Sequence, residues 1–291
     1  MAELKIKQVA ALHDLSSFGR CALTVVIPAL SSMGVQVLPV PTALLSTHTG
    51  GFTDYYFEDT SRAITPIADH WQSLGISPDA VYTGFLSGEE QCDLIEDFIC
   101  RFKKSGALIL VDPVFADDGV LYSSCTEGLV NRMRKLCTHG DVLVPNLTEA
   151  CMLCEKEYLD TSKMSEQELS TYLDTLLDAL SAFGAKRIAI TGIVSCGGGS
   201  VITAGRDLTE HSIDKSTFYI SLKHIGGSYP GTGDLFASVL LGKLLGGATF
   251  TASASAASAF VRDVIAYSEK YGEPKRNGVA LEPCLRKLSQ L

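Results

Sequence analysis

A glycine-spaced loop that runs directly into an apolar helical segment is the feature of this sequence best suited to chemistry. Residues 226–247 read GGSYPGTGDLFASVLLGKLLGG. Gly231 and Gly233 allow a tight turn and close approach of a ligand, and the amides of Gly231, Thr232 and Gly233 at the helix start predict an anion-binding site. Asp234 either complements the helix dipole or acts as a general base beside that site. An anion hole next to a base indicates phosphoryl transfer, in which positioning and charge stabilisation supply most of the rate.

Two polar loops in the middle of the chain add oxygen ligands. Asp112 and Asp117 lie in VDPVFADDG, and Asn146 and Glu149 lie in VPNLTEA, each after an apolar run. Both loops also have a structural interpretation: Asp112 can start a turn before Pro113, and Asn146 with Glu149 can form a helix capping box. If the loops meet at one edge of a sheet, their oxygens predict a site for Mg²⁺ and its water shell.

Composition and motifs narrow the class of partner. The 291 residues carry a formal net charge of −9, which argues against a nucleic-acid partner because phosphate backbones select basic surfaces. The N-terminus lacks the apolar run of a signal peptide and no run is long enough for a membrane span, so we expect a cytoplasmic protein. The sequence has no G-x-x-x-x-G-K-[ST] loop, which excludes a P-loop enzyme, and no G-x-G-x-x-G after the first strand.

The nine cysteines are scattered along the chain. Their number and spacing fit reduced thiols better than disulfide bonds. The single C-x-x-C, formed by Cys151 and Cys154, lacks the second pair that a zinc site would need, and we interpret it as two small residues on a buried helix face. Cys21 and Cys196 are candidate reactive thiols near the expected pocket, against the more common role of free cysteines as small buried side chains.

The elements that must position the polar residues alternate along the chain. Strand-like apolar runs at residues 6–12, 35–45, 79–86, 107–114, 141–146 and 185–193 alternate with helical patterns, which predicts a parallel sheet covered on both faces. Ligands of such sheets bind at the carboxyl ends of the strands. The polar residues expected at that edge are Asp14, Ser16, residues 47–49, residues 83–85, Asp112, Asp117, Asn146, Glu149 and Thr191.

The pattern changes after Ile193. Short segments at residues 195–205, 206–213 and 216–227 are joined by glycine and aspartate turns, which predicts antiparallel strands at one edge of the sheet. Two helices are predicted to follow, at residues 232–245 and about 252–271. No linker or repeat divides the chain, so we expect a single domain over residues 1–291.

Five segments, in this order along the chain, carry a family resemblance. They are STHTG at residues 46–50, TGF at 83–85, DPV at 112–114, PNLTE at 145–149 and GTGD at 231–234. Together they resemble the ribokinase-like superfamily and, within it, the pyridoxal (vitamin B6) kinases. The resemblance covers nearly the whole chain. It implies a three-layer α/β/α sandwich with a mostly parallel sheet and a small flap, around residues 42–56, instead of a full lid domain.

The resemblance also implies an activity and roles for single residues. The activity is ATP-dependent phosphorylation of the 5′-hydroxymethyl group of pyridoxal, pyridoxine or pyridoxamine. Asp234 is then the catalytic base, and Gly231, Thr232 and Gly233 form the anion hole. The residues implied to handle ATP phosphates are Asp112, Asp117, Asn146, Glu149, Thr191 and Thr232, with Asp112 and Glu149 holding Mg²⁺ through water. The residues implied to face the substrate are Ser16, His48, Thr49, Phe85 and Asp234.

Three departures from the family pattern keep the ring substrate open. Thr47 stands where these kinases usually have asparagine and Phe85 where they often have tyrosine, while the loop HDLSSFG at residues 13–19 is closer to that of hydroxymethylpyrimidine kinases. A hydroxymethylpyrimidine kinase, or one of mixed specificity, is therefore the main alternative. His48 can also bind backbone only. The resemblance implies ATP, Mg²⁺ and a homodimer, and it leaves open a monovalent cation such as K⁺.

Two further classes fit the sequence less well. A non-catalytic protein that binds pyridoxal phosphate or nucleotide has no use for a base beside an anion hole, so the complete GTGD segment at residues 231–234 argues against it. A sugar or nucleoside kinase would need more hydrogen-bonding side chains for several hydroxyls, and the early loops offer few.

Overall fold

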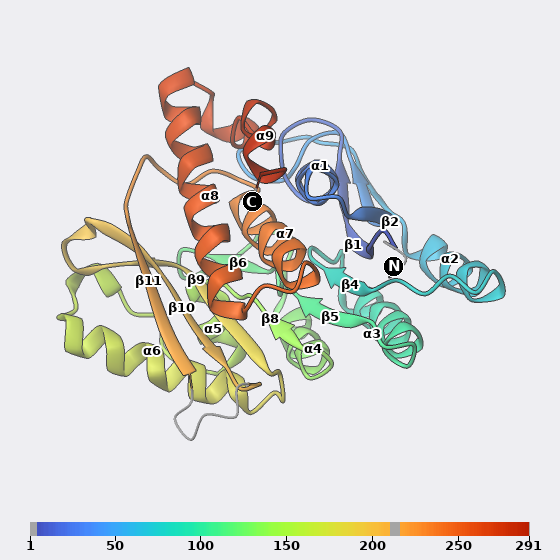
Figure 1. Cartoon of the computed structure of the whole chain (residues 1–291), viewed down its shortest axis with the longest axis horizontal. Helices are drawn as coiled ribbons and strands as arrows, with labels where there is room; N and C mark the ends of the chain where they lie inside the picture. Colours follow the sequence, from blue (N-terminus) through green and yellow to red (C-terminus); the bar gives the residue numbers. More distant parts are fainter. Residues whose placement is uncertain (1–4, 210–215, 291) are drawn as a thin grey trace.

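A nine-stranded sheet forms the centre of the computed structural model, which describes residues 5–209 and 216–290. The strand order is β11-β10-β9-β8-β5-β4-β1-β2-β3 (Figure 1). Every neighbouring pair from β9 to β2 is parallel. The antiparallel strands lie at the two edges, β10 and β11 at one and β3 at the other.

Among the parallel strands, β1, β2 and β9 have eight to ten residues, and β4, β5 and β8 have two to four. They are β1 (Gln8–Ser16), β2 (Gln36–Leu45), β4 (Ala80–Thr83), β5 (Leu108–Val111), β8 (Val142–Leu143) and β9 (Arg187–Val194). The edge strands are β3 (Phe57–Asp59), β10 (Ser200–Asp207) and β11 (Ser216–Lys223). A separate two-stranded ribbon consists of β6 (Ala116–Asp117) and β7 (Val120–Leu121).

Helices cover both faces of the sheet, and each face has its own apolar core. One layer consists of α2 (Ser61–Ser73), α3 (Glu89–Lys103), α4 (Glu127–Cys137), α5 (Leu147–Leu153) and α6 (Glu166–Ser181). The other consists of α1 (Leu23–Ser32), α7 (Thr232–Leu245), α8 (Phe250–Tyr271) and α9 (Leu285–Leu288). The predicted α/β/α sandwich is confirmed. No helix in the described ranges is both long and apolar enough to span a membrane.

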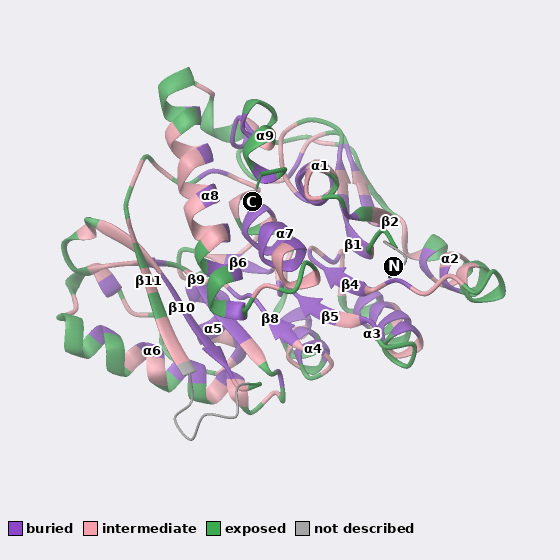
Figure 2. Ribbon diagram, in the orientation of Figure 1, coloured by how far each residue is buried: buried purple, intermediate pink, exposed green. Residues whose placement is uncertain are grey.

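The burial of α3 and α7 shows how the layers differ. α3 buries Cys92, Ile95, Phe98, Ile99 and Phe102, at helical spacing, and leaves its other face to solvent, as expected of a surface helix. α7 buries every residue of 235–242, because it lies between the sheet and its neighbours α1 and α8. Figure 2 shows α7 and the central strands as a continuous buried region. The residues that directly follow Asp234 are therefore packed in the core.

Several details differ from the sequence predictions, among them the ribbon of β6 and β7, which was not predicted. β1 continues to Ser16 and β9 extends past Thr191, so Asp14, Ser16 and Thr191 lie within strand ends instead of after them. β3 adds a second antiparallel edge that was not predicted, because its three residues are exposed and show no alternation. Of the expected strand at residues 206–213, the first two residues belong to β10 and residues 208–209 form a bend, while residues 210–213 lie outside the described part.

The sheet has a topological switch point between β1 and β4. From β1 the chain continues to β2 at one side, whereas β4, β5, β8 and β9 are added successively at the other. At such a point the loops leave the carboxyl ends of the strands in opposite directions and open a crevice, where ligands of open α/β sheets bind. His13 and Asp14, near the end of β1, and Thr83, at the end of β4, lie at the carboxyl ends of the two strands that form the switch point.

Candidate active site

The loop before α7 has the backbone geometry expected of an anion site. Gly231 is the N-cap of α7, with φ of 81°. A Cβ added there would lie 2.2 Å from the carbonyl oxygen of Arg20, so only glycine fits. The Leu235 amide is bonded to the Gly231 carbonyl. The amides of Thr232, Gly233 and Asp234 thus precede the first α-helical bond, as in any helix start, and have no partner within the helix.

Asp234 lies where two helix starts meet. Its Oδ2 accepts a hydrogen bond of 2.8 Å from the amide of Ala22, the N-cap residue of α1. Its Oδ1 lies 3.7 Å from Nδ1 of His13, and the side chain retains 14% exposure. Burial raises the pKa of Asp234 to about 6, and the Ala22 amide opposes that rise. A carboxylate with a pKa near the working pH and one oxygen free of a backbone donor has the properties of a general base.

Asp14 and Ser16 form a buried pair beside Asp234. The Ser16 hydroxyl donates a hydrogen bond of 2.8 Å to Asp14 Oδ2. Burial raises the pKa of Asp14 to about 7; the Ser16 hydroxyl lowers this pKa, and the nearby Asp234 charge adds to the rise. The Ser16 hydroxyl, expected to face the substrate ring, is therefore committed to Asp14 in this structure. Asp14 was noted only as a polar residue near the end of the first strand.

Asn146 and Glu149 form the capping box that the sequence allowed as their structural interpretation. The Glu149 amide donates to Asn146 Oδ1 at 2.9 Å, and the Asn146 amide donates to Glu149 Oε2 at 2.8 Å. Glu149 Oε1 also accepts the Phe115 amide at 3.3 Å, and Asn146 Nδ2 donates to the Ala116 carbonyl at 2.7 Å. The box thus joins the start of α5 to the loop after β5.

The same cluster contains two buried carboxyl groups, Asp112 and Glu149, whose pKa values are raised. Asp112 is buried at 5% exposure. Burial, and then the Asp234 charge, raise its pKa well above the ordinary value; burial, and then Asp112, do the same for Glu149. Asp117 is half-buried and accepts the Asp118 amide at 2.9 Å. Thr191 forms a β-bridge with Asn146, so all five predicted phosphate-side residues of these loops lie at one edge of the sheet.

The carboxyl cluster suits a cation that keeps its water. No group of three or more histidine, cysteine, aspartate or glutamate side chains in the described ranges is placed to hold a metal ion directly. The charge of Asp112 nevertheless raises the pKa of Glu149, and that of Asp234 raises the pKa of Asp112. A divalent cation nearby would relieve this repulsion. Mg²⁺ commonly binds through one or two carboxylates, several waters and substrate phosphates. Asp112 and Glu149 therefore fit an ion held through water.

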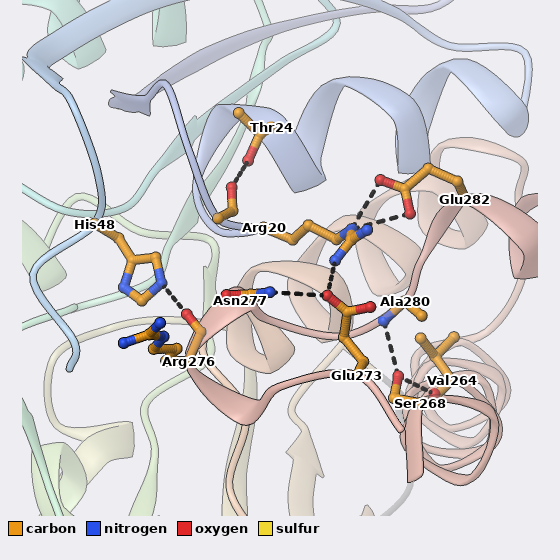
Figure 3. A network of polar contacts seen from close by, with 11 residues as sticks. Arg20, Thr24, His48, Val264, Ser268, Glu273, Arg276, Asn277, Ala280 and Glu282 are labelled. Carbon is orange, nitrogen blue, oxygen red and sulfur yellow. Dashed lines mark hydrogen bonds and ion pairs between the residues drawn. The ribbon is translucent and has the colours of Figure 1, made fainter. Parts of the chain in front are cut away.

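His48 is bound to backbone at both ring nitrogens. Nε2 is 2.7 Å from the Arg276 carbonyl, and Nδ1 accepts the Gly50 amide at 3.1 Å, so Nε2 is the donor (Figure 3). Phe52 packs edge-on against the His48 ring with centroids 5.0 Å apart. The backbone-only interpretation of His48 describes this structure, in which the ring ties the loop at residues 46–56 to the C-terminal segment. Thr49 beside it is half-buried.

Arg20 anchors the loop that carries Ala22. Its Nε lies 2.8 Å from Glu282 and its Nη1 3.0 Å from Glu273 (Figure 3). The Arg20 amide donates to the Asn277 carbonyl at 3.0 Å. Its guanidinium is thus engaged by two carboxylates instead of being free to reach a phosphate. The loop is held between the C-terminal segment and Gly231, which positions the Ala22 amide on Asp234.

The other residues noted in the sequence differ in how far they are buried and bonded. Phe85 is half-buried just after β4, and its carbonyl accepts the Thr42 hydroxyl at 2.8 Å. Thr47 and Thr83 each bury a hydroxyl oxygen that has no hydrogen-bond partner among the described residues. Burial raises the pKa of Cys21 well above the ordinary value, followed by the Asp14 and Asp234 charges, which argues against a reactive thiolate. Cys196 is exposed.

Comparison with known proteins identifies the family. The sequence pattern of the phosphomethylpyrimidine kinases matches residues 26–278. The chain belongs to the phosphomethylpyrimidine kinase family. A Bacteroides thetaiotaomicron protein assigned to these kinases is 35% identical, and the superposition covers 99% of this chain and 96% of that one with a TM-score of 0.89. A second crystal form of that protein contains pyridoxal.

Pyridoxal kinases are also similar to this chain. The enzyme from Lactobacillus plantarum is 28% identical, with 98% of this chain and 97% of that chain covered and a TM-score of 0.84. Pyridoxal kinase PdxY of Vibrio campbellii is 30% identical over 161 residues, which are 51% of this chain and 53% of that protein, so the match spans about half of that relative's length. The resemblance to ribokinase-like vitamin B6 kinases is confirmed.

Two site residues were missed by the sequence analysis. His13 was placed beyond the end of the first strand and given no role, and Ala22 contributes only its backbone amide. Neither has a local sequence signal, because both meet Asp234 from more than two hundred positions away.

Proposed function

We propose that this protein is an ATP-dependent kinase that phosphorylates the 5′-hydroxymethyl group of a vitamin B6 vitamer. The observation that carries the proposal is the arrangement at residues 231–234. A carboxylate of raised pKa lies beside amides that have no partner within the helix. The kinase relatives of closely similar fold support the same reaction class.

In the proposed reaction, Asp234 acts on the acceptor hydroxyl. Its Oδ1 takes the hydroxyl proton as the substrate oxygen forms a bond to the γ-phosphorus of ATP, and the bond from that phosphorus to the β–γ bridging oxygen breaks to release ADP. The amides of Gly231, Thr232 and Gly233 would hold the negative phosphoryl oxygens during transfer. The Ala22 amide keeps Oδ2 occupied, which leaves Oδ1 for the proton.

Asp112 and Glu149 are proposed to hold Mg²⁺ through water, and Asp117, Asn146 and Thr191 to line the phosphate side. Bound Mg²⁺ supplies charge neutralisation of the triphosphate. For Asn146 and Glu149 this role comes in addition to the capping box, since their oxygens already accept backbone amides. The homodimer, the cytoplasmic location and any requirement for K⁺ stay predictions based on the family resemblance.

A pyridine substrate is favoured over a pyrimidine. Pyridoxal occurs in the crystal of the Bacteroides relative, and the Lactobacillus relative is a pyridoxal kinase. We propose that Thr49 and Phe85 border the substrate and that Ser16 takes part through Asp14. The family description, phosphomethylpyrimidine kinase, supports the alternative that hydroxymethylpyrimidine is also phosphorylated.

A competition assay distinguishes these substrates. Purified protein receives ATP and Mg²⁺ with pyridoxal, pyridoxine, pyridoxamine or hydroxymethylpyrimidine, and kcat/KM is measured for each. We expect all three B6 vitamers to be phosphorylated, with the pyrimidine at least about tenfold poorer, since a pocket that leaves a polar group unpaired rejects the wrong ring. A preference for the pyrimidine would replace the proposed substrate, and no turnover with any acceptor would overturn the kinase proposal.

A further inference from the structure

A buried histidine next to Asp234 has no hydrogen-bond partner. His13 is 0% exposed, and neither Nδ1 nor Nε2 has a partner among the described residues. Burial lowers the pKa of His13 to about 3, so the ring is neutral at neutral pH and its pair with Asp234 is not an ion pair. A buried polar group without a partner destabilises a folded protein. Its position beside the proposed base suggests that the partner is acquired during function.

The surroundings of the ring fix its orientation. Tyr82 of β4 meets the His13 ring edge-on, with centroids 4.2 Å apart and planes at 79°. A Cβ added at Gly84 would lie 2.1 Å from His13 Nδ1, so glycine at this position leaves the space that the ring occupies. Asp234 Oδ1 is 3.7 Å from the same Nδ1. The nitrogen that faces Asp234 is thus held in place by two neighbouring strands of the switch point.

The chemistry of the pair determines which nitrogen carries the proton. An ionised carboxylate only accepts hydrogen bonds, so the nitrogen facing it must be the donor, and in a neutral imidazole this requires the Nδ1–H tautomer. The separation of 3.7 Å is about 0.7 Å longer than an ordinary N–H···O bond. Hydrogen bonds at catalytic groups are often long in free enzymes and tighten in the substrate complex.

We propose that His13 is a positioning residue for Asp234 that donates its Nδ1–H to Oδ1 in the substrate complex. The bond would orient the carboxylate together with the Ala22 amide on Oδ2, and it would keep Asp234 ionised at neutral pH. His13 neither gains nor loses a proton; the substrate proton goes to the second lone pair of Asp234 Oδ1, which the His13 bond leaves available. This inference rests on the proposed function, since it assigns a partner to the proposed base.

The charges around Asp234 explain why such a donor is needed. Burial raises the pKa of five titratable groups around Asp234, and the charge of Asp234 adds to the rise. These groups are Asp14 on β1, Cys21 before α1, Tyr82 on β4, Asp112 after β5 and Tyr122 after β7. Asp112 in turn raises the pKa of Glu149. None of them is a cation. In this acidic surrounding, a neutral donor stabilises the carboxylate without the cost of burying another charge.

The test compares three substitutions of His13 that differ in where a donor remains. In His13→Asn the amide nitrogen can occupy the place of Nδ1, whereas in His13→Gln it reaches the place of Nε2. His13→Phe keeps the ring against Tyr82 without any donor. Each variant of the full chain is assayed for kcat and KM with ATP, Mg²⁺ and pyridoxal between pH 5 and 9, and its folding is checked by thermal unfolding and ADP binding.

We expect His13→Phe and His13→Gln to lower kcat about fivefold at pH 6, and up to about tenfold at lower pH, with KM little changed, as for the loss of one hydrogen bond to a charged group. The acid limb of their kcat profile should move up by about one pH unit, so that kcat approaches the wild-type value at high pH. His13→Asn should recover most of the loss. A purely structural role would instead lower kcat equally at every pH and would not separate Asn from Gln.

Two outcomes would overturn the inference: pH profiles of all three variants that coincide with the wild type, or equal losses in His13→Asn and His13→Gln at every pH. If a variant is unstable at the assay temperature, kcat of His13→Asn and His13→Gln is compared at reduced temperature. The rates are then divided by the folded fraction, which ADP binding reports. Failure of the proposed function is distinguishable, because it would appear as absent turnover in the wild type or as full activity in Asp234→Asn.

Discussion

The two acidic parts of the site are built in different ways. Asp234 has a single backbone bond, from the Ala22 amide to Oδ2, and its Oδ1 lies 3.7 Å from His13 Nδ1. Glu149 accepts two backbone amides and is bound within a capping box. Glu149 stabilises the local structure whether or not a ligand is present. Asp234 contributes little to stability, because other residues at a helix start could accept the same amide bond. This contrast predicts that substitutions at the two carboxylates separate activity from stability.

The largest effect is expected at Asp234. Asp234→Asn keeps an oxygen for the Ala22 amide but removes the base, so kcat should fall by about 10²–10⁴-fold while ATP binding is retained. Rapid-quench measurement of phosphoryl transfer, with isothermal titration of ATP, checks both parts. A variant that turns over like the wild type would remove Asp234 from the mechanism.

The same substitution should raise stability at alkaline pH. The carboxyl pKa of Asp234 rises from an ordinary 3.8 to about 6 on folding, so the folded state binds the proton more tightly and stability declines as pH rises from 3.8 to 6. Above pH 6 this shift of roughly two pKa units lowers the free energy of unfolding by about 3 kcal/mol. Urea unfolding should therefore find Asp234→Asn more stable than the wild type at pH 8 and nearly equal at pH 4. A stability difference that does not change with pH would contradict the pKa shift.

Gly231 tests whether the loop geometry is specific to the site. Gly231→Ala combines a positive φ with a clash against the Arg20 carbonyl, whereas Gly247→Ala, at a φ of 87° after α7, meets no atom within 4 Å. Both should lose about 1 kcal/mol of stability from backbone strain, and Gly231→Ala should lose more because the Arg20 carbonyl must also move. Only Gly231→Ala should also lower kcat, by about tenfold or more, because the amides and the Ala22 loop are displaced. Equal kinetics in the two variants would show that the close approach is not needed.

The smallest effect is expected at Glu149. Glu149→Gln can keep only one amide acceptor and loses the charge, so the Mg²⁺ concentration for half-maximal rate should rise severalfold, while stability changes by about 1 kcal/mol or less. Glu168→Gln is the matched control, because Glu168 forms the same capping box with Ser165 at the start of α6. An unchanged Mg²⁺ titration in Glu149→Gln would leave this residue with its capping role alone.

The fold was largely predictable because its signals are local. Alternating apolar runs and helical patterns predicted the parallel sheet, and α7 was predicted at its observed bounds, residues 232–245. β3, β6 and β7 were missed because they have two or three residues each and only one buried residue among them. Such strands are defined by their pairing and not by periodicity.

The site was predictable only in part. The GTGD segment carries its glycines, amides and carboxylate within four residues, so the loop and the helix start at Asp234 follow from local sequence. The Ala22 amide meets Asp234 from 212 positions away, and His13 meets it across the switch point. His48 shows the opposite problem: a polar residue in a family-like segment is occupied by the Arg276 carbonyl and the Gly50 amide. The roles assigned to these residues stay predictions.

The most direct test is transfer of the γ-phosphoryl group from ATP to pyridoxal by the full chain, with pyridoxal 5′-phosphate identified by mass and Asp234→Asn run in parallel at pH 7.5. The structure and its relatives predict pyridoxal 5′-phosphate with the wild type and at least about a hundredfold less with the variant. Absence of this product with the wild type, or equal amounts of it from both proteins, would contradict the central claim that Asp234 is the base of a vitamin B6 kinase.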